Sequence, residues 1–272
     1  MKFIKIKARA KINLSLNIIS KLPSKIHKIE SLITFVKLHD IIYFRITNST
    51  KHKVYFIGKF SKKISKKNTV NLLLEILDKK NLLNNQKFEI KIVKNIPQMS
   101  GMGGGSMNAA SFLSFFLKKK ILNLTKKKLI NISNLIGSDV ILGLKIKNKV
   151  LSANGNLTSI NKKLFYNVLI VKPNFGCSTK LIFSKVKQFS RAKYNEPNLL
   201  LFKKDNIIAS KNDLEKIAFK KYPKLKELKV FLSKLPDVEF SRMTGSGSAI
   251  VAYFHSKKAL NIATIKIKKQ FE

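Results

Sequence analysis

A glycine-rich segment is the part of this sequence whose residue types most directly indicate chemistry. Four of the eleven glycines lie between positions 101 and 105, within the segment from Ile96 to Ser106. Glycine permits positive φ and lets a ligand approach bare backbone N–H groups. An apolar run suited to a helix follows directly, and a helix start adds unpaired donors and a positive dipole. The segment therefore predicts a phosphate-binding loop and nucleotide chemistry.

The spacing of this segment excludes two common kinds of phosphate loop. No Lys-Ser/Thr pair follows the last glycine, as a Walker P-loop requires, and the third glycine of the dinucleotide fingerprint is missing. A different arrangement of residues must therefore hold the phosphates. A second glycine cluster, Thr244-Gly245-Ser246-Gly247-Ser248, precedes a strand-like segment near the C-terminus. It indicates either a second functional loop or an ordinary tight turn.

Two ionisable residues have surroundings that set them apart. Asp139 is one of 14 acidic residues, and it follows Gly137-Ser138 and leads into an apolar run. A carboxylate at that place can accept a proton from a substrate hydroxyl, which phosphoryl transfer requires. A helix cap or a turn aspartate is the alternative. Lys11 lies in a strand-like segment with Ala8, Ala10 and Ile12, although taken alone it could be one more surface lysine.

The composition limits the number of domains and the cellular compartments that are compatible with the chain. With 272 residues and 44% hydrophobic residues, two packed domains are feasible, and we expect them at residues 1–160 and 161–272. Cys177 is the single cysteine, so no internal disulfide can form, and lysines interrupt the apolar positions of the first twenty residues. No apolar stretch approaches the roughly 20 residues that span a bilayer. We therefore expect a cytoplasmic protein with no membrane partner.

The net charge of +41 suggests a nucleic-acid-binding protein as an alternative class. Arginine is the residue expected at specific phosphate and base contacts, yet four of the 55 basic residues are arginine and the rest are lysine. The lysines are spread over every segment, and asparagine and isoleucine are abundant with them. AT-rich coding drift accounts for this pattern, so we expect no specific nucleic-acid partner.

The hydrophobic periodicity predicts an α+β protein. Alternating patterns predict extended segments near residues 3–18, which form two strands or one bent strand, and at 31–46, 88–92, 165–171 and 249–254. Helical spacing is found at 68–80, 109–117, 129–136, 181–189, 213–218, 225–235 and 257–269. Asn154-Gly155 predicts a hairpin turn. Strand, glycine loop and helix therefore occur in that order around residue 101.

Taken in order, these motifs resemble those of the GHMP kinases. The resemblance rests on residues 10–13, 97–110, 137–140 and 243–249 and runs nearly end to end. It implies a two-lobed fold, with an N-terminal lobe like ribosomal protein S5 domain 2 and a ferredoxin-like C-terminal lobe. Within the family, the sequence is most similar to members that use ATP and Mg²⁺ to phosphorylate the C2 hydroxyl of a cytidylyl methylerythritol in non-mevalonate isoprenoid biosynthesis.

The resemblance also implies roles for individual residues. Asp139 draws the proton from the hydroxyl, while Lys11 keeps Asp139 ionised and offsets negative charge in the transition state. Ser106 lies near phosphate or magnesium. His27 bonds to cytosine and Phe183 stacks on it. The implied ATP-binding residues are Asn68, Lys94, Pro97, Gly101, Gly103, Gly104, Gly105 and Ser106; the implied acceptor-binding residues are Asn13, His27, Thr179, Phe183 and Gly245.

Several positions depart from the family pattern. Lys25-Ile26 stands where Gly-Tyr is common, so one aromatic face around the cytosine is missing. Met107 replaces a second serine of the glycine loop, Ile141 replaces a proline and Asn156 an acidic residue. A GHMP kinase for another small alcohol and a non-catalytic relative are therefore alternatives. A monomer and a homodimer are both compatible with the sequence.

Overall fold

The computed structural model describes residues 2–24 and 26–271, which form two compact units. Unit 1 comprises residues up to 11, 35–98 and 103–146, and unit 2 comprises 12–34, 99–102 and 147–272. Two long strands, β1 (Ile4–Asn13) and β3 (His27–Thr47), contribute residues to both units. The sequence predicted two domains with a single boundary at residue 160, and this boundary stays a prediction.

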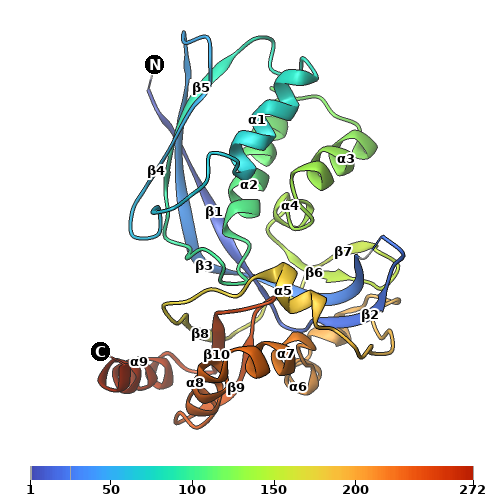
Figure 1. Cartoon of the computed structure of the whole chain (residues 1–272), viewed down its shortest axis with the longest axis vertical. Coiled ribbons are helices and arrows are strands. Elements are labelled where there is room, and N and C mark those ends of the chain that lie inside the picture. The colour runs from blue at the N-terminus through green and yellow to red at the C-terminus, as the bar shows by residue number, and fades with distance from the viewer. Residues whose placement is uncertain (1, 25, 272) are drawn as a thin grey trace. The chain divides into compact units, whose positions relative to one another are not determined.

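Unit 1 consists of strands with helices beside them (Figure 1). The second half of β3 pairs antiparallel with β5 (Lys87–Val93), which pairs parallel with β4 (Lys53–Ile57). In Figure 1 the helices of this unit lie on one side of these strands. They are α1 (Thr69–Lys79), α2 (Gly104–Lys118), α3 (Lys126–Ile136) and α4 (Val140–Gly143).

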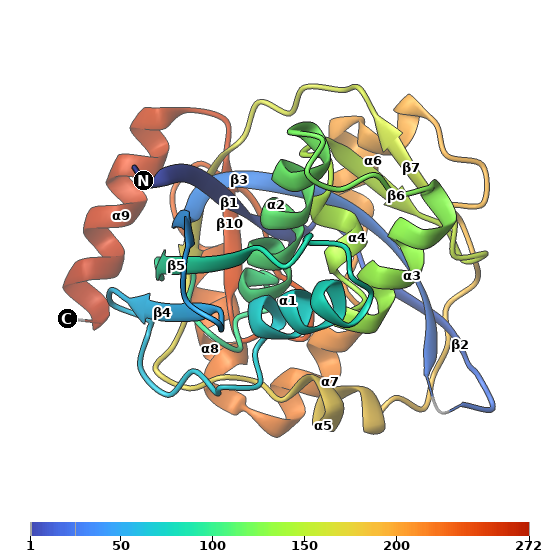
Figure 2. The same ribbon diagram turned by 90° about the horizontal axis from the view of Figure 1, so that it is seen from above.

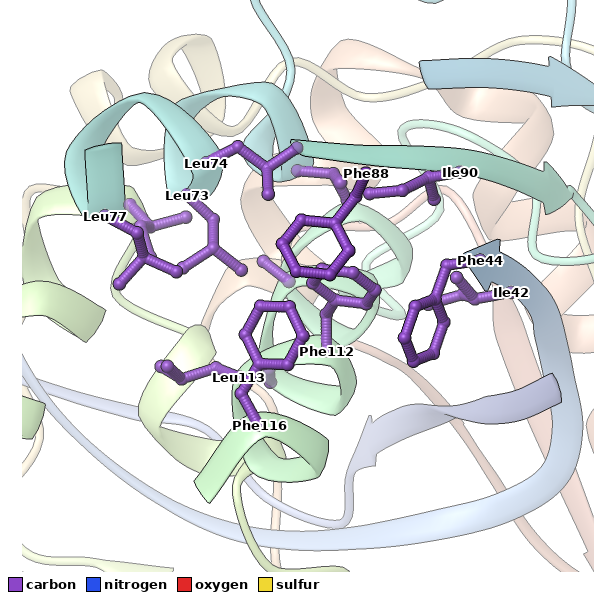
Figure 3. Close-up of a cluster of buried hydrophobic side chains, with 14 of the residues drawn as sticks. Ile42, Phe44, Leu73, Leu74, Leu77, Phe88, Ile90, Phe112, Leu113 and Phe116 are labelled. Carbon is purple, nitrogen blue, oxygen red and sulfur yellow. The ribbon is translucent and has the colours of Figure 1, made fainter. Parts of the chain in front are cut away.

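An aromatic cluster forms the core of unit 1 (Figure 3). Alternation along β3 and β5 points Phe44 and Phe88 to the same side, where they meet Phe112 and Phe116 of α2. The ring centroids of Phe44 and Phe112 are 4.7 Å apart. Each buried phenylalanine stabilises the fold by about 2–3 kcal/mol. This packing fixes α2 on the strands and thereby positions the glycine segment at its start.

Unit 2 contains β2 (Asn17–Lys21), which pairs with the first part of β3, and the hairpin of β6 (Asn148–Leu151) and β7 (Leu157–Ile160). Gly155 has φ +79° in the turn, so the predicted hairpin is confirmed. A separate antiparallel sheet has the order β8 (Asn167–Val171), β10 (Ile250–Phe254), β9 (Val238–Met243). The helices of unit 2 are α5 (Thr179–Ser184), α6 (Lys204–Ala209), α7 (Leu214–Lys221), α8 (Pro223–Ser233) and α9 (Lys257–Phe271), with a 3₁₀ turn at Leu199–Phe202.

Alternation in β10 divides the two faces of this sheet. Ile250, Ala252 and Phe254 belong to a hydrophobic cluster with residues of α8 and α9, and Figure 2 shows α9 beside β10. Tyr253 points to the other face and stacks on Phe240 at 4.1 Å between ring centroids. Helices therefore cover one face, and aromatic rings lie on the other.

The structure differs from the sequence predictions at several elements. The helix predicted for residues 181–189 ends at Ser184, because the chain beyond it runs to Lys193 and Tyr194, whose N–H groups donate to the buried carboxylate of Glu30. Strands β4 and β9 and helix α6 have no counterpart in the predictions. Within the described residues, no helix combines the length and apolar character needed to cross a membrane.

Candidate active site

Lys11 and Asp139 form an ion pair in unit 1. Lys11 Nζ lies 3.3 Å from Asp139 Oδ2, and the two side chains are 6% and 37% exposed. Lys11 comes from β1, where its neighbours Ala10 and Ile12 are buried. Asp139 stands at the cap position of α4, yet its side chain makes no capping hydrogen bond. The carboxylate therefore faces the lysine instead of closing a helix end, which removes the helix-cap alternative.

The glycine segment begins α2 directly against this pair. Gly103 is the cap residue of α2 with φ +67°, and a Cβ at this position would lie 3.2 Å from Lys11 Cε and 3.4 Å from Asp139 Oδ2. A side chain would thus be strained and would crowd both partners. The amides of the first turn of α2 have no intrahelical acceptors, and no acidic residue stands in that turn. An anion-binding helix end therefore adjoins a carboxylate and an ammonium group.

Two further elements of unit 1 support the start of α2. A Cβ built on Gly104 would lie 3.3 Å from Lys94 Nζ, and this lysine is 4% exposed and paired with Asp40. Thr69 donates from Oγ1 to the carbonyl of Gly105 at 2.6 Å. Pro97 follows in the same unit and is half-buried. The structure thus brings Lys94 to the loop.

Asn68 has a role that the sequence analysis did not assign. Its side-chain oxygen accepts from the N–H groups of Val70 and Asn71 at 3.1 and 3.0 Å, which makes it the N-cap of α1. Its amide nitrogen donates to the carbonyls of Ser65 and Lys66. The side chain is therefore engaged locally, and its predicted contact with ATP stays a prediction.

Ser106 lies in the first turn of α2, and a Cβ built on Gly137 would be 3.6 Å from its Oγ. Among residues 2–24 and 26–271 its hydroxyl has no hydrogen-bond partner, and no cluster of three or more His, Cys, Asp or Glu side chains could hold a metal ion. Magnesium bound with nucleotides usually takes one or two protein ligands, phosphate oxygens and waters. A single hydroxyl in the first turn of α2 is compatible with that kind of site.

In unit 2 the two glycine clusters contact each other. The N–H groups of Ser248 and Ala249 donate to the carbonyls of Met99 and Ser100 at 3.1 and 3.2 Å. A Cβ on Gly101 would lie 1.9 Å from the carbonyl oxygen of Thr244, and one on Gly245 would lie 2.9 Å from that of Gly101. These close approaches explain why glycine occurs in both clusters. The second cluster is therefore more than an ordinary turn, since it supports residues 99–102.

The same cluster bonds to two of the predicted acceptor residues. The N–H of Asn13 donates to Thr244 Oγ1 at 3.0 Å, and the Asn13 side chain donates to Ser31 Oγ at 2.8 Å. Thr179 Oγ1 and Ser246 Oγ are 2.9 Å apart. Asn13 and Thr179 therefore bond to Thr244 and Ser246, the two residues that flank Gly245 in unit 2.

His27 and Phe183, the two residues that the resemblance assigns to cytosine, are neighbours in unit 2. Their ring centroids are 5.3 Å apart with planes tilted by 47°. His27 Nε2 is buried and has no hydrogen-bond partner in the described part of the chain. Burial, and then the charge of Lys21, lower the pKa of His27, which favours the neutral ring. Ile26 is 65% exposed, and Lys25 lies outside the described residues.

Cys177 lies under the second glycine cluster, where a Cβ on Gly247 would be 3.3 Å from its Sγ. The residue is 1% exposed, and burial raises the pKa of the thiol to about 11. A protonated, buried thiol is a poor nucleophile, so this cysteine is a packing residue.

Comparisons with known proteins agree with this geometry. The family described as "GHMP kinases N terminal domain" matches residues 67–145. The 4-diphosphocytidyl-2-C-methyl-D-erythritol kinase of Pelagibacter ubique is 54% identical over 271 residues, covering 100% of this chain and 96% of the relative. The enzyme of that name from Petrotoga mobilis is 32% identical and covers 90% of this chain and 96% of its own length.

This chain belongs to the 4-diphosphocytidyl-2-C-methyl-D-erythritol kinase family. The kinase family accounts for the enzyme class and for ATP as the phosphoryl donor. A solved 4-(cytidine 5'-diphospho)-2C-methyl-D-erythritol kinase has a TM-score of 0.80 at 21% identity, covering 98% of this chain and 96% of that one. A homoserine kinase from Cytophaga hutchinsonii reaches 0.69 at 17% identity, covering 100% and 91%. The predicted α+β GHMP kinase fold is confirmed.

Some residues that shape this kinase site were not found from the sequence. Thr69, Thr244 and Asp40 each bond to a predicted site residue or its loop. Thr244 lies in a glycine cluster that the sequence did single out. Asp40 and Thr69 gave no signal, because one acidic residue in a long strand and one threonine at a helix start are ordinary features.

Proposed function

We propose that this kinase transfers the γ-phosphoryl group of ATP, with Mg²⁺, to the C2 hydroxyl of 4-diphosphocytidyl-2-C-methyl-D-erythritol. The observation that carries the proposal is the 3.3 Å pair of Lys11 and Asp139 against Gly103, at the start of a helix with free amides. A base, a cation and an anion-binding helix end are the parts that phosphoryl transfer needs. The relatives that match 100% and 90% of this chain are named 4-diphosphocytidyl-2-C-methyl-D-erythritol kinases, which supports the proposed acceptor.

Asp139 acts as the general base in this proposal. The hydroxyl oxygen forms a bond to the γ-phosphorus, the bond from that phosphorus to the β–γ bridging oxygen breaks, and ADP leaves. The hydroxyl proton passes to a carboxylate oxygen of Asp139. That carboxylate is 37% exposed and is not used by a helix cap, so a hydroxyl can reach it.

Lys11 and the first turn of α2 stabilise the charge that develops on the transferring group. The ammonium group comes from a buried stem, and the N–H groups are fixed by the helix, so neither must reorganise during the reaction. When bound, Mg²⁺ neutralises phosphate oxygens, and Ser106 is the residue that would hold it.

On the acceptor side, we assign the cytosine to His27 and Phe183. The buried, unpartnered Nε2 of His27 offers a hydrogen-bonding group, and Phe183 offers a ring face. Ile26 provides apolar surface where relatives commonly have an aromatic ring, so we expect weaker stacking. We further propose a cytoplasmic location, since the one cysteine is free and buried.

The test is ATP turnover with purified 4-diphosphocytidyl-2-C-methyl-D-erythritol by the wild-type enzyme and by Asp139→Ala. The variant should lose turnover by about 10³-fold while it still binds ATP, because the base acts in the chemical step. Glu227→Gln, an exposed acidic position on α8, is the matched control and should keep full turnover.

Mevalonate and homoserine are the competing acceptors in this assay. Turnover of either one without turnover of the cytidylyl substrate would assign the chain to another small alcohol. An Asp139→Ala enzyme with wild-type turnover would contradict the assignment of the base.

A further inference from the structure

Asp40 is a fully buried carboxylate beside the predicted ATP-binding lysine. Its side chain is 0% exposed, at the point where the pairing of β3 with β5 ends at Ile41 and Val93. Oδ1 accepts from the N–H groups of Asn95 and Ile96 at 2.7 and 2.8 Å. Oδ2 pairs with the ammonium group of Lys94. One carboxylate thus fixes both the lysine and the backbone that leads to the glycine segment.

The ammonium group of Lys94 is held at a place that is electrostatically unfavourable in the free protein. Its Nζ would lie 3.3 Å from a Cβ on Gly104, the first residue of α2, and Lys94 is 4% exposed. The start of a helix carries positive potential, so a buried cation there is repelled. The charge of Asp40 offsets that of Lys94, and the charge of Asp139 offsets that of Lys11, so neither carboxylate supplies a surplus negative charge to the helix amides. Such an arrangement favours the binding of a further anion at the start of α2.

We propose that Asp40 is a positioning residue for nucleotide phosphate, which acts by holding the Lys94 ammonium against the first turn of α2. The inference rests on the proposed function in one respect, that this turn binds ATP. Lys94 contacts the nucleotide, and Asp40 acts through Lys94 without touching it. Removing the carboxylate lets the ammonium group of Lys94 move away from the helix amides. The phosphate then keeps the amides but loses the ammonium group, and the two must act together to bind it.

The experiment measures binding of a non-hydrolysable ATP analogue with MgCl₂ by calorimetry in five proteins: wild type, Asp40→Asn, Lys94→Met, the double variant and Glu89→Gln. Asn can still accept the two backbone N–H bonds but cannot neutralise Lys94. Glu89→Gln is the matched control, because it breaks the more exposed pair with Arg45 between β3 and β5. Binding of the cytidylyl acceptor is measured in each protein.

Asp40→Asn should weaken analogue binding by about tenfold, as expected for a hydrogen bond to a charged group. Acceptor binding and the Glu89→Gln control should stay within about twofold of wild type. Lys94→Met and the double variant should bind the analogue equally weakly, since Asp40 has nothing to position once the ammonium is gone. The proposal is overturned if Asp40→Asn binds the analogue as well as wild type or better, or if the two losses multiply.

A second variant keeps the test decisive if the unpaired ammonium prevents Asp40→Asn from folding. Asp40→Glu retains the charge but moves the carboxylate by one methylene, so it should fold and still weaken analogue binding. Analogue binding equal to wild type in Asp40→Glu would overturn the inference. Because analogue binding needs no acceptor, a failure to phosphorylate the cytidylyl alcohol would reject the proposed function and leave this result standing.

Discussion

The two halves of the first glycine segment are held by different kinds of interaction. Residues 103–106 lie in unit 1 near charged groups, with Lys11, Asp139 and Lys94 around them. Residues 99–102 lie in unit 2 and bond to backbone and hydroxyl groups of the second glycine cluster. Charge is therefore concentrated where a phosphoryl group would react. Neutral hydrogen bonds hold the neighbouring chain without adding a field that would compete for the phosphate.

A deeply buried cation of unit 2, Arg242, also fits this contrast. Arg242 is 5% exposed, and its guanidinium group donates to four backbone carbonyls. Burial lowers the pKa of this group, yet the carbonyls keep its donors satisfied. The four acceptors belong to Leu14, Ile207, Ile208 and Ser210. Arg242 thus joins the chain after Asn13 to the end of α6 and stabilises the fold.

The largest effect on catalysis is expected from a substitution in the charged region around residues 103–106. Lys11→Met should lower kcat by about 10²–10³-fold, because an ammonium aimed at developing charge is lost. The thermal midpoint should change little, since methionine fills the space of the lysine stem. Steady-state kinetics and a melting curve measure the two quantities. Lys7→Met, at an exposed position on the same strand, is the control; a similar kcat loss in both variants would contradict the role of Lys11.

A smaller effect, on stability, is expected when the hydrogen bonds of Arg242 in unit 2 are removed. Arg242→Met should lower the free energy of unfolding by about 3 kcal/mol, because four buried carbonyls lose a charged donor. Arg242→Lys should recover less than half of this loss, as an ammonium lacks the fixed fork of a guanidinium. Urea unfolding gives the values, with the exposed Arg191→Met as a control. A loss in unfolding free energy below about 1 kcal/mol in Arg242→Met would show that water molecules donate to the four carbonyls in place of Arg242.

A further prediction, which includes the smallest single effect, that of Gly155→Ala, compares two glycines with similar backbone conformations. Gly101 and Gly155 have φ of +74° and +79°, but a Cβ on Gly101 would meet the Thr244 carbonyl, whereas one on Gly155 has no neighbour within 4 Å. Gly155→Ala should cost about 1 kcal/mol from backbone strain alone. Gly101→Ala should cost about 1–3 kcal/mol more, because the two loops must separate. Equal losses in chemical denaturation would mean that the contact between the clusters is not tight.

Local structure was predictable wherever the chain repeats a pattern. Strand β5, helix α1 and the turn at Gly155 follow from alternation, helical spacing and an Asn-Gly pair. Strand β4 was missed because its residues, KVYFI, form a short continuous apolar run without alternation, and periodicity alone does not assign such a run to a strand. The helix after residue 181 was predicted too long because a distant carboxylate, that of Glu30, binds the amides further along the chain.

The sequence by itself determined the family and the places where the backbone must adopt glycine conformations, and its resemblance to that family implied Asp139 as the base and Lys11 as the cation. It could do so because glycine conformations, helix starts and residue chemistry are local properties. Tertiary structure alone decided that Lys11 meets Asp139, that Asp40 holds Lys94 and that Thr244 bonds to Asn13. These contacts join residues far apart in the chain, and they form because the summed packing of the strands and helices, such as the phenylalanine core under α2, fixes the register.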